Sequence, residues 1–319
     1  MTDPAEGGIT YSVIIPVYGN ADTLREVVAR LGALQENLDG ALEAVFVVDG
    51  SPDSSLAVLR DILPAAALRS QLLSHSRNFG SFAAIKTGIV ASRGSYLGVM
   101  AADLQEPVEL MGAFFAELAA GRADVVVGRR ERRADPGVTT MSSKAFWWFY
   151  RKVINRDIPR GGVDVFGCTR EVAEDLVSLN ESQSSLVGLL YWVGYRRHEV
   201  PYERLPRPSG RSAWTFRKRL RYLMDSVFAF TNIPIMLLLL IGAVGSALTA
   251  VVGLVVLVSW LTGHITEPGY TPLMITMAMS TFSLLLGLGI VGAYVARTYE
   301  NSKSRPHAIT MRQWTFDER

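Results

Sequence analysis

Acidic and amide side chains directly follow one buried strand of this chain. The apolar run Tyr96–Met100 predicts the strand, and Asp103, Gln105 and Glu106 come after it. Open α/β sheets bind ligands at the carboxyl ends of their strands, and a carboxylate followed two residues later by an amide oxygen suits a hard cation. The alternative is that Asp103 caps the helix that opens at Pro107, because acids favour helix N-termini. The segment therefore predicts either a cation site for a phosphate-bearing ligand or a helix cap.

Three further predicted strands end in polar residues, and in a parallel sheet these ends meet at one edge. Asp49 follows the second strand, where it can accept hydrogen bonds from a ribose or a base, or form an Asx turn with Ser54 as the helix cap. The third strand is followed by Arg77 and Asn78, and the first by the turn Pro16–Asn20. Each motif alone is a weak indication. Four strand ends that deliver polar groups to one edge together predict a binding site.

The elements that must position these residues alternate between strand and helix from Tyr11 to about Gly128. Short β-branched runs predict strands at Ser12–Val17, Ala44–Val48, Gln71–Ser74, Tyr96–Met100 and Asp124–Gly128. Apolar periodicity predicts helices between them, at Asp22–Gln35, Ser54–Leu63, Phe82–Val90 and Pro107–Ala119. This alternation implies right-handed crossovers and a mostly parallel sheet in an α/β domain.

The composition narrows the class of protein. The chain has 319 residues, enough for one large or two smaller domains, and its 49 % of apolar residues suit a globular core with some membrane segments. A formal net charge of only +2 gives no support for nucleic acid as a partner. Cys168 is the single cysteine and the histidines lack ligand spacing, which argues against a disulfide framework and a Cys- or His-based metal site. No apolar signal segment precedes Gly8, so the first part of the chain is expected to stay in the cytosol.

Two long uncharged segments near the C-terminus predict membrane spans. Residues 226–263 and 268–296 contain no Asp, Glu, Lys or Arg, and a span needs about 20 mostly apolar residues. We place the spans at about Ile235–Leu261 and Leu273–Ala296, with buried core helices as the alternative. The flanks are basic whereas residues 262–271 contain no Lys or Arg, which places both termini in the cytosol and the loop outside.

Two amphipathic segments precede the spans. Ala145–Ile154 is rich in aromatic residues, and Thr215–Phe230 carries an apolar face opposite a cluster of Arg and Lys. Basic amphipathic helices with aromatic faces lie in the plane of a bilayer surface. We therefore expect interfacial helices here, with a soluble core helix as the alternative for each.

Short motifs occur in a defined order along nearly the whole chain. They are Ile15-Pro16-Val17-Tyr18, Asp49-Gly50-Ser51-x-Asp53, Ser76-Arg77-Asn78-Phe79-Gly80, Ala102-Asp103-Leu104-Gln105-Glu106-Pro107, Gly128-Arg129-Arg130, Gly162-Val163-Asp164 and Arg204-x-Pro206-Arg207-x-x-Gly210. In combination they resemble the family 2 glycosyltransferases. The most similar branch is that of the polyprenyl-phosphate glycosyltransferases, which includes dolichol-phosphate mannose synthase and bacterial undecaprenyl-phosphate glucosyltransferases.

This resemblance implies a glycosyltransferase-A fold, which is Rossmann-like, a nucleotide-diphosphate sugar donor, a polyprenyl phosphate acceptor and inversion at the anomeric centre. It implies that Asp164 is the catalytic base and that Asp103, also counted as catalytic, holds Mg²⁺ or Mn²⁺ together with Gln105. The residues implied for the nucleotide-sugar site are Pro16, Tyr18, Asp49, Ser51, Arg77, Ala102, Asp103 and Arg130. Several positions depart from the pattern: Gly19-Asn20 stand in place of Asn-Glu, Phe166 replaces an Arg of some relatives, and a Lys usual near Ala213 is absent. Ala101 and Val48 stand where the family commonly has an acid and an Asp or Asn. The cation would therefore have one carboxylate ligand fewer.

Arg207 and Arg211 follow the catalytic motifs and precede the second amphipathic segment. They could hold the lipid phosphate through charge-assisted hydrogen bonds. The alternative is contact with anionic lipid headgroups in general.

The expected organisation is a cytosolic catalytic domain over residues 1–213, which includes the helix near 145–154. An interfacial helix over 214–230, two spans within 231–298 and a cytosolic tail over 299–319 follow. The expected function is transfer of one sugar, UDP-linked by preference, to undecaprenyl phosphate at the cytosolic face of the cell membrane. A GDP-mannose-dependent polyprenyl-phosphate mannose synthase is one alternative, and a non-catalytic membrane scaffold is another. The resemblance also allows a homo-oligomer, which is a tetramer in some relatives.

Overall fold

A computed structural model describes residues 8–38, 41–131, 151–152, 157–159, 162–179, 185–205, 216–262, 269–303 and 305–317. The chain divides into two compact units. The first comprises residues 1–220 and 305–319, and the second comprises residues 221–304. Each unit is described by itself.

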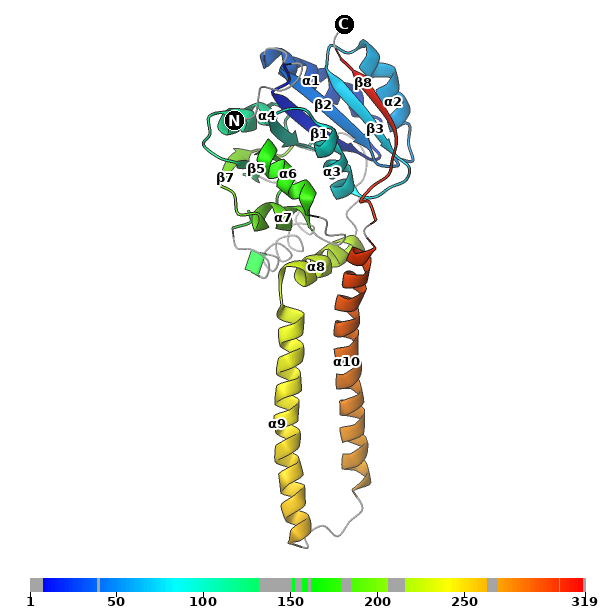
Figure 1. Cartoon of the computed structure of the whole chain (residues 1–319), viewed down its shortest axis with the longest axis vertical. Helices are drawn as coiled ribbons and strands as arrows, with labels where there is room; N and C mark the ends of the chain where they lie inside the picture. The colour runs from blue at the N-terminus through cyan, green and yellow to red at the C-terminus, as the bar shows by residue number, and fades with distance from the viewer. Residues whose placement is uncertain are drawn as a thin grey trace. The chain divides into compact units, whose positions relative to one another are not determined.

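The first unit is built on one sheet, which contains eight strands among the described residues (Figure 1). The strands are β1 (Tyr11–Val17), β2 (Leu42–Val48), β3 (Ser70–His75), β4 (Tyr96–Val99), β5 (Val125–Arg130), β6 (Phe166–Thr169), β7 (Arg197–Tyr202) and β8 (Thr310–Phe316). Their order is β7-β5-β6-β4-β1-β2-β3-β8. Pairing is parallel for β1 with β2 and β4, for β2 with β3 and for β5 with β7, while β6 and β8 run antiparallel to their neighbours. The mostly parallel α/β sheet that the sequence predicts is confirmed.

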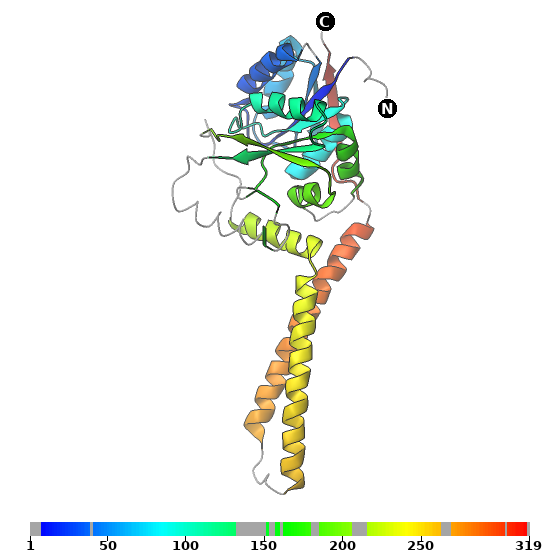
Figure 2. The ribbon, with the colours of Figure 1, turned by 90° about the vertical axis from the view of Figure 1, so that its left-hand side faces the viewer.

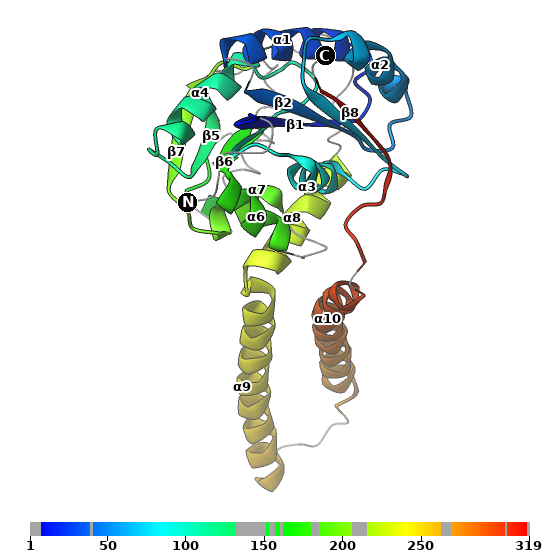
Figure 3. The ribbon, with the colours of Figure 1, turned by 45° about the horizontal axis from the view of Figure 1, so that its top comes forward.

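Helices cover both faces of this sheet (Figure 3). They are α1 (Leu24–Asn37), α2 (Ser55–Ile62), α3 (Ser81–Ala91), α4 (Glu109–Ala119), α6 (Arg170–Ser178) and α7 (Leu186–Trp192), with a short 3₁₀ turn η1 (Leu63–Ala65). Helices α1 and α2 lie on one face, and α3 and α6 lie on the other. The four helices predicted from periodicity are therefore present as α1 to α4, with ends that differ by a few residues.

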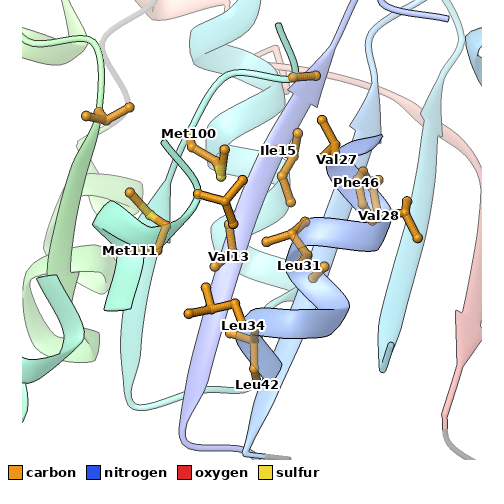
Figure 4. Close-up of a cluster of buried hydrophobic side chains, with 14 of the residues drawn as sticks. Val13, Ile15, Val27, Val28, Leu31, Leu34, Leu42, Phe46, Met100 and Met111 are labelled. Carbon is orange, nitrogen blue, oxygen red and sulfur yellow. The ribbon is translucent and has the colours of Figure 1, made fainter. Parts of the chain in front are cut away.

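The core forms where the alternating side chains of β1 and β2 meet helices α1 and α4 (Figure 4). Val13, Ile15 and Phe46 are fully buried there and pack against Val27 and Leu31 of α1. Each buried side chain of this size contributes about 1.5–3 kcal/mol relative to an exposed one. The next residues along the strands point to the other face because successive side chains alternate. This core fixes the strands whose ends carry the polar residues.

Among the described residues, strands β6, β7 and β8 and helices α6 and α7 were not predicted from the sequence. Strand β6 inserts antiparallel between β4 and β5, and β8 pairs antiparallel with β3 after the chain has passed through the second unit. Pairing with β8 covers the backbone edge of β3, which an open sheet would leave exposed. The C-terminal residues are thus part of the fold of the first unit.

The second unit consists mainly of the long helices α9 (Ile233–Leu261) and α10 (Tyr270–Ser302) (Figures 1 and 2). Some residues of the two helices lie in contact. Helix α8 (Phe216–Phe230) precedes them, and Asp225 of α8 pairs with Arg297 of α10 at 2.8 Å. The helices match the segments that the sequence predicts as spans.

Within the described residues, no single helix is both long and apolar enough to qualify as a membrane span. The segments Leu223–Phe230 and Ile233–Gly245 qualify only as a pair, with a bend of 75° between them. The predicted two-span hairpin is therefore not confirmed, and membrane insertion stays a prediction.

Candidate active site

Strand direction gathers the predicted residues at one edge of the sheet. The carboxyl ends of β1 to β5 and β7 lie at this edge because these strands point the same way. Strand β6 runs in the opposite direction, so its amino end lies there instead, with Phe166 opposite Val99 and Val127. Asp164, two residues before Phe166, is thereby brought to the edge that also carries Asp103.

Asp164 forms an ion pair with Arg130 of β5. The hydroxyl of Tyr202, at the end of β7, donates to Asp164 Oδ2 at 3.3 Å. Burial raises the pKa of Tyr202, and the negative charge of Glu106 adds to this, so the hydroxyl keeps its proton. The Arg130 side chain is 9 % exposed and the Asp164 side chain 28 % exposed. The pair thus presents an oriented, charge-neutralised carboxylate to solvent.

The loop after β4 is stabilised by the burial of Leu104 and by hydrogen bonds to Ala102 and Asp103. Leu104 is buried and adopts φ 55, a left-handed conformation that is strained for a residue with a Cβ. The Thr23 hydroxyl donates to the carbonyl of Ala102 at 2.6 Å, and the Gln105 N–H donates to Asp103 Oδ1 at 3.3 Å. The Asp103 carboxylate therefore accepts a bond from its own loop, as an Asx turn does, and is partly exposed.

Gln105 faces a cation of the protein itself. Its Oε1 accepts from Arg204 Nη2 at 2.8 Å, and its carbonyl accepts from the Leu205 N–H at 2.8 Å. Arg204 Nε also lies 3.4 Å from Oε1 of the buried Glu106. The amide oxygen that was assigned to a metal ion therefore contacts a guanidinium in this structure. Arg204 was not among the predicted site residues, although it belongs to the quoted motif Arg204-x-Pro206-Arg207.

The donor set for a divalent cation is small. Across the described residues there is no group of three His, Cys, Asp or Glu side chains that could hold a metal ion. One carboxylate ligand, such as that of Asp103, fits Mg²⁺ or Mn²⁺ when substrate phosphates and water supply the other oxygens. The site is therefore suited to a cation that arrives with a phosphate-bearing ligand.

Ser51 and Asp53 join the loop after β2 to the loop after β1. Ser51 Oγ accepts from the Gly19 N–H at 2.8 Å and donates to Asp53 Oδ1 at 2.5 Å. Asp53 also accepts from the backbone N–H groups of Ala21 and Ser55, at 3.0 and 3.1 Å. Burial alone would raise the pKa of Asp53, but these hydrogen bonds outweigh it and lower the pKa to about 2. Ser51, which was predicted to contact the nucleotide sugar, thus links the loop after β2 to the loop after β1 through its hydrogen bond with Gly19.

Asp49 is buried and is bonded within the protein. Its carboxylate accepts from the N–H groups of Phe79 and Gly80, at 2.8 and 2.7 Å, and contacts His75 Nδ1 at 2.8 Å. Tyr18 is 47 % exposed, and the exposed Arg77 guanidinium lies 4.1 Å from the centre of the Phe79 ring. Tyr18 and Arg77 therefore face solvent at the edge, whereas Asp49 organises the loop beside them.

The remaining predicted residues are placed as follows. Pro16 lies within β1 opposite Val47, and Ala102 is buried with its carbonyl bonded as described above. Arg207 and Arg211 lie outside the described residues, as does most of Ala145–Ile154. Their roles stay predictions.

The family model for "Glycosyl transferase family 2" matches residues 12–172. The putative glycosyltransferase CsbB of Bacillus subtilis is 32 % identical over 93 % of this chain and 90 % of its own length. The bactoprenol glucosyl transferase of Shigella phage SfV is 28 % identical over 93 % of this chain and 97 % of its own length. The chain belongs to glycosyl transferase family 2, as its sequence predicted.

A solved structure with a similar fold is glucosyl-3-phosphoglycerate synthase from Mycobacterium tuberculosis, in complex with Mn²⁺, UDP-glucose and phosphoglyceric acid. It covers 70 % of this chain and 78 % of its own, with 16 % identity and a TM-score of 0.50. This likeness bears on the fold alone, and it agrees with the predicted glycosyltransferase-A architecture. The protein is thus a family 2 glycosyltransferase with its candidate site at the carboxyl edge of the sheet.

Proposed function

We propose that the protein transfers one sugar, glucose by preference, from a UDP-sugar to a polyprenyl phosphate such as undecaprenyl phosphate. The observation that carries this proposal is the ion pair of Asp164 with Arg130 at the sheet edge that also presents Asp103. Relatives named bactoprenol glucosyl transferase align over 93 % of the chain, so their similarity includes the helices of the second unit. These two observations support both the reaction and the lipid acceptor.

The reaction is a displacement with inversion. An oxygen of the acceptor phosphate attacks the anomeric carbon, the bond from that carbon to the donor's β-phosphate oxygen breaks, and the electron pair leaves with the nucleoside diphosphate. A divalent cation, when bound, would stabilise the charge that develops on that diphosphate. Asp103 would hold this cation together with the donor's phosphates.

Asp164 acts next to a nucleophile that is already largely anionic near neutral pH. Positioning therefore matters more than proton removal, and correct alignment of reacting atoms is worth a large share of a barrier. Arg130 offsets the negative charge of Asp164, which lowers the repulsion between this carboxylate and an incoming phosphate. Tyr202 fixes the carboxylate from a second side.

The acceptor is proposed to reach the site from the cytosolic face of the cell membrane. The uncharged segments within α9 and α10, and the basic residues that flank them, support this location. Arg207 and Arg211 are proposed to hold the lipid phosphate. Whether the protein works as a homo-oligomer stays a prediction from the resemblance.

The test is a donor screen with the full chain in detergent and undecaprenyl phosphate as acceptor. UDP- and GDP-sugars are offered in parallel, with Mg²⁺ or Mn²⁺, and the lipid product is identified by mass spectrometry. We expect a polyprenyl-monophosphate hexose from a UDP-sugar and a larger thermal shift with UDP than with GDP. Product from GDP-mannose alone would instead identify the mannose synthase, and no transfer from any donor would favour the scaffold.

A further inference from the structure

The carboxylate of Asp49 accepts hydrogen bonds from the loop between β3 and α3. Oδ1 accepts from the Phe79 N–H and Oδ2 from the Gly80 N–H, both in the segment between β3 and α3. The Asp49 carbonyl accepts from Asn78 Nδ2 at 3.3 Å. Asp49 thus binds Asn78, Phe79 and Gly80 and determines the path of the segment that carries Arg77.

His75 supports Asp49 from inside the sheet. The side chains of His75 and Asp49 are 0 % and 3 % exposed, and His75 Nδ1 lies 2.8 Å from Asp49 Oδ1. Because a carboxylate only accepts, Nδ1 carries the proton, and Nε2 is left to bond the Thr87 hydroxyl at 3.0 Å. The Phe79 ring packs edge-on against the imidazole with centroids 5.6 Å apart. His75 therefore joins α3, Asp49 and the loop in one buried hydrogen-bonded chain.

The backbone of the loop packs directly against Gly50. Gly50 has φ +56, and a Cβ at this position would overlap the backbone of Arg77 and Asn78. The Arg77 guanidinium stacks on the ring of Phe79, whose N–H is held by Asp49. The position of this cation at the sheet edge thus depends on Asp49 and, through it, on His75.

We propose that His75 is a positioning residue for donor binding, which holds Asp49 so that the loop Ser76–Gly80 presents Arg77 to the nucleotide sugar. This inference rests on the proposed function for the identity of the ligand. It also gives Asp49 a task within the protein, because its two carboxylate oxygens bond this loop and His75, and direct contact of Asp49 with the nucleotide stays a prediction.

Two isosteric variants separate the roles of the two ring nitrogens. In His75→Asn the amide nitrogen can replace Nδ1 and keep the bond to Asp49, whereas in His75→Gln it replaces Nε2 and reaches Thr87 only. His75→Leu removes both bonds. The full chain is compared by hydrogen exchange of the peptide that covers residues 76–82 and by steady-state kinetics with the UDP-sugar.

We expect His75→Leu and His75→Gln to speed exchange in this peptide and to raise the donor KM, each by about tenfold, since a hydrogen bond to a charged group is lost. We expect kcat to stay within about twofold, because the groups at the reacting atoms are unchanged. His75→Asn should stay near wild type in both measurements. Equal behaviour of the Asn and Gln variants, unchanged exchange in His75→Leu, or faster exchange with an unchanged donor KM would each overturn the proposal.

Ser12→Ala is the matched control. Ser12 Oγ bonds the buried Glu43 at 2.7 Å, near the amino ends of β1 and β2 and away from the loop. This variant should lower the melting temperature and leave both loop exchange and donor KM unchanged. The exchange measurement needs no donor. If the wild type bound and used no nucleotide sugar, the proposed function would fail, while the exchange data would still decide whether His75 holds the loop.

Discussion

Asp49 and Asp164 lie at the same edge of one sheet and are the same residue type, yet their surroundings differ. Asp49 is almost fully buried, and its two oxygens accept bonds from the loop after β3 and from His75. Asp164 keeps 28 % of its side chain exposed and is paired with one guanidinium and one hydroxyl. The comparison teaches that a place at the carboxyl edge does not make an acid a reacting group. Burial and partners distinguish a carboxylate that holds a loop from one that is exposed to solvent.

Asp103 is partly exposed at the sheet edge, as Asp164 is. Its loss should have the largest effect on sugar transfer. We expect Asp103→Ala to lower sugar transfer by about 10³-fold, because several kcal/mol of charge stabilisation on the leaving diphosphate would be lost. Transfer is measured with a labelled donor over a Mn²⁺ titration. EDTA should abolish wild-type activity, and added Mn²⁺ should restore it.

The control is Asp61→Ala. Asp61 lies in α2 and forms an exposed ion pair with Arg25, so its loss should leave sugar transfer unchanged. Calorimetry adds a second readout. Mn²⁺ should bind the wild type much more tightly with UDP present, because the cage offers few protein ligands. Equal Mn²⁺ affinity with and without UDP would contradict the assignment of a donor-completed site.

Exchanging the carboxylates for amides at Asp164 and Asp49 sharpens the contrast directly. Asp164→Asn should lower kcat by about 10²-fold with the donor KM nearly unchanged, because the acceptor is misaligned. Asp49→Asn should instead raise the donor KM and lower the melting temperature with a smaller effect on kcat. The two variants are compared in one kinetic assay, and an unchanged turnover in Asp164→Asn would remove this residue from the mechanism.

A substitution at Gly50 measures how closely this residue packs against the loop after β3. Gly50→Ala should destabilise the protein by about 2–3 kcal/mol, because it adds both left-handed strain and an overlap with the loop backbone. For a unit of this size that corresponds to a melting temperature lower by roughly 4–12 °C. Gly121→Ala is the control, since it has φ +66 but open space around a Cβ, and should cost only about 1 kcal/mol. Equal losses for the two variants would show that the contact with Arg77 and Asn78 adds nothing.

Asp53 should give the smallest effect, and it depends on pH. Its folded pKa of about 2 lies below the ordinary value of 3.8, so its stabilisation is present above pH 3.8 and is lost as the pH falls toward 2. Asp53→Asn should cost less than about 1 kcal/mol at pH 7, because solvent screens this surface network. Melting temperatures of variant and wild type should converge near pH 2, and a constant difference down to that pH would refute this account.

Much of this molecule was predictable from local patterns. The apolar runs of β1 to β5 and the periodicity of α1 to α4 act over a few residues, so the sequence predicted these elements and the parallel sheet. The strand-end motifs also predicted that Asp49, Arg77 and Asp103 lie at one edge, and the motifs in combination predicted the family. The resemblance also predicts, from Ala101, a cation site with one carboxylate fewer, and this stays a prediction.

The tertiary structure decided what depends on distant partners. Strand β6 was not predicted, because its place depends on pairing with β4 and β5, and its antiparallel insertion brings Asp164 to Arg130. Strand β8 joins the sheet by pairing with β3. The side chains of Gln313 and Gln71, which are 242 residues apart, form a hydrogen bond between these two strands. The contact of Gln105 with Arg204 and the burial of Asp49 beside His75 follow from the same kind of long-range packing. A sequence specifies which groups are available, but only the folded chain determines their burial and their hydrogen-bond partners.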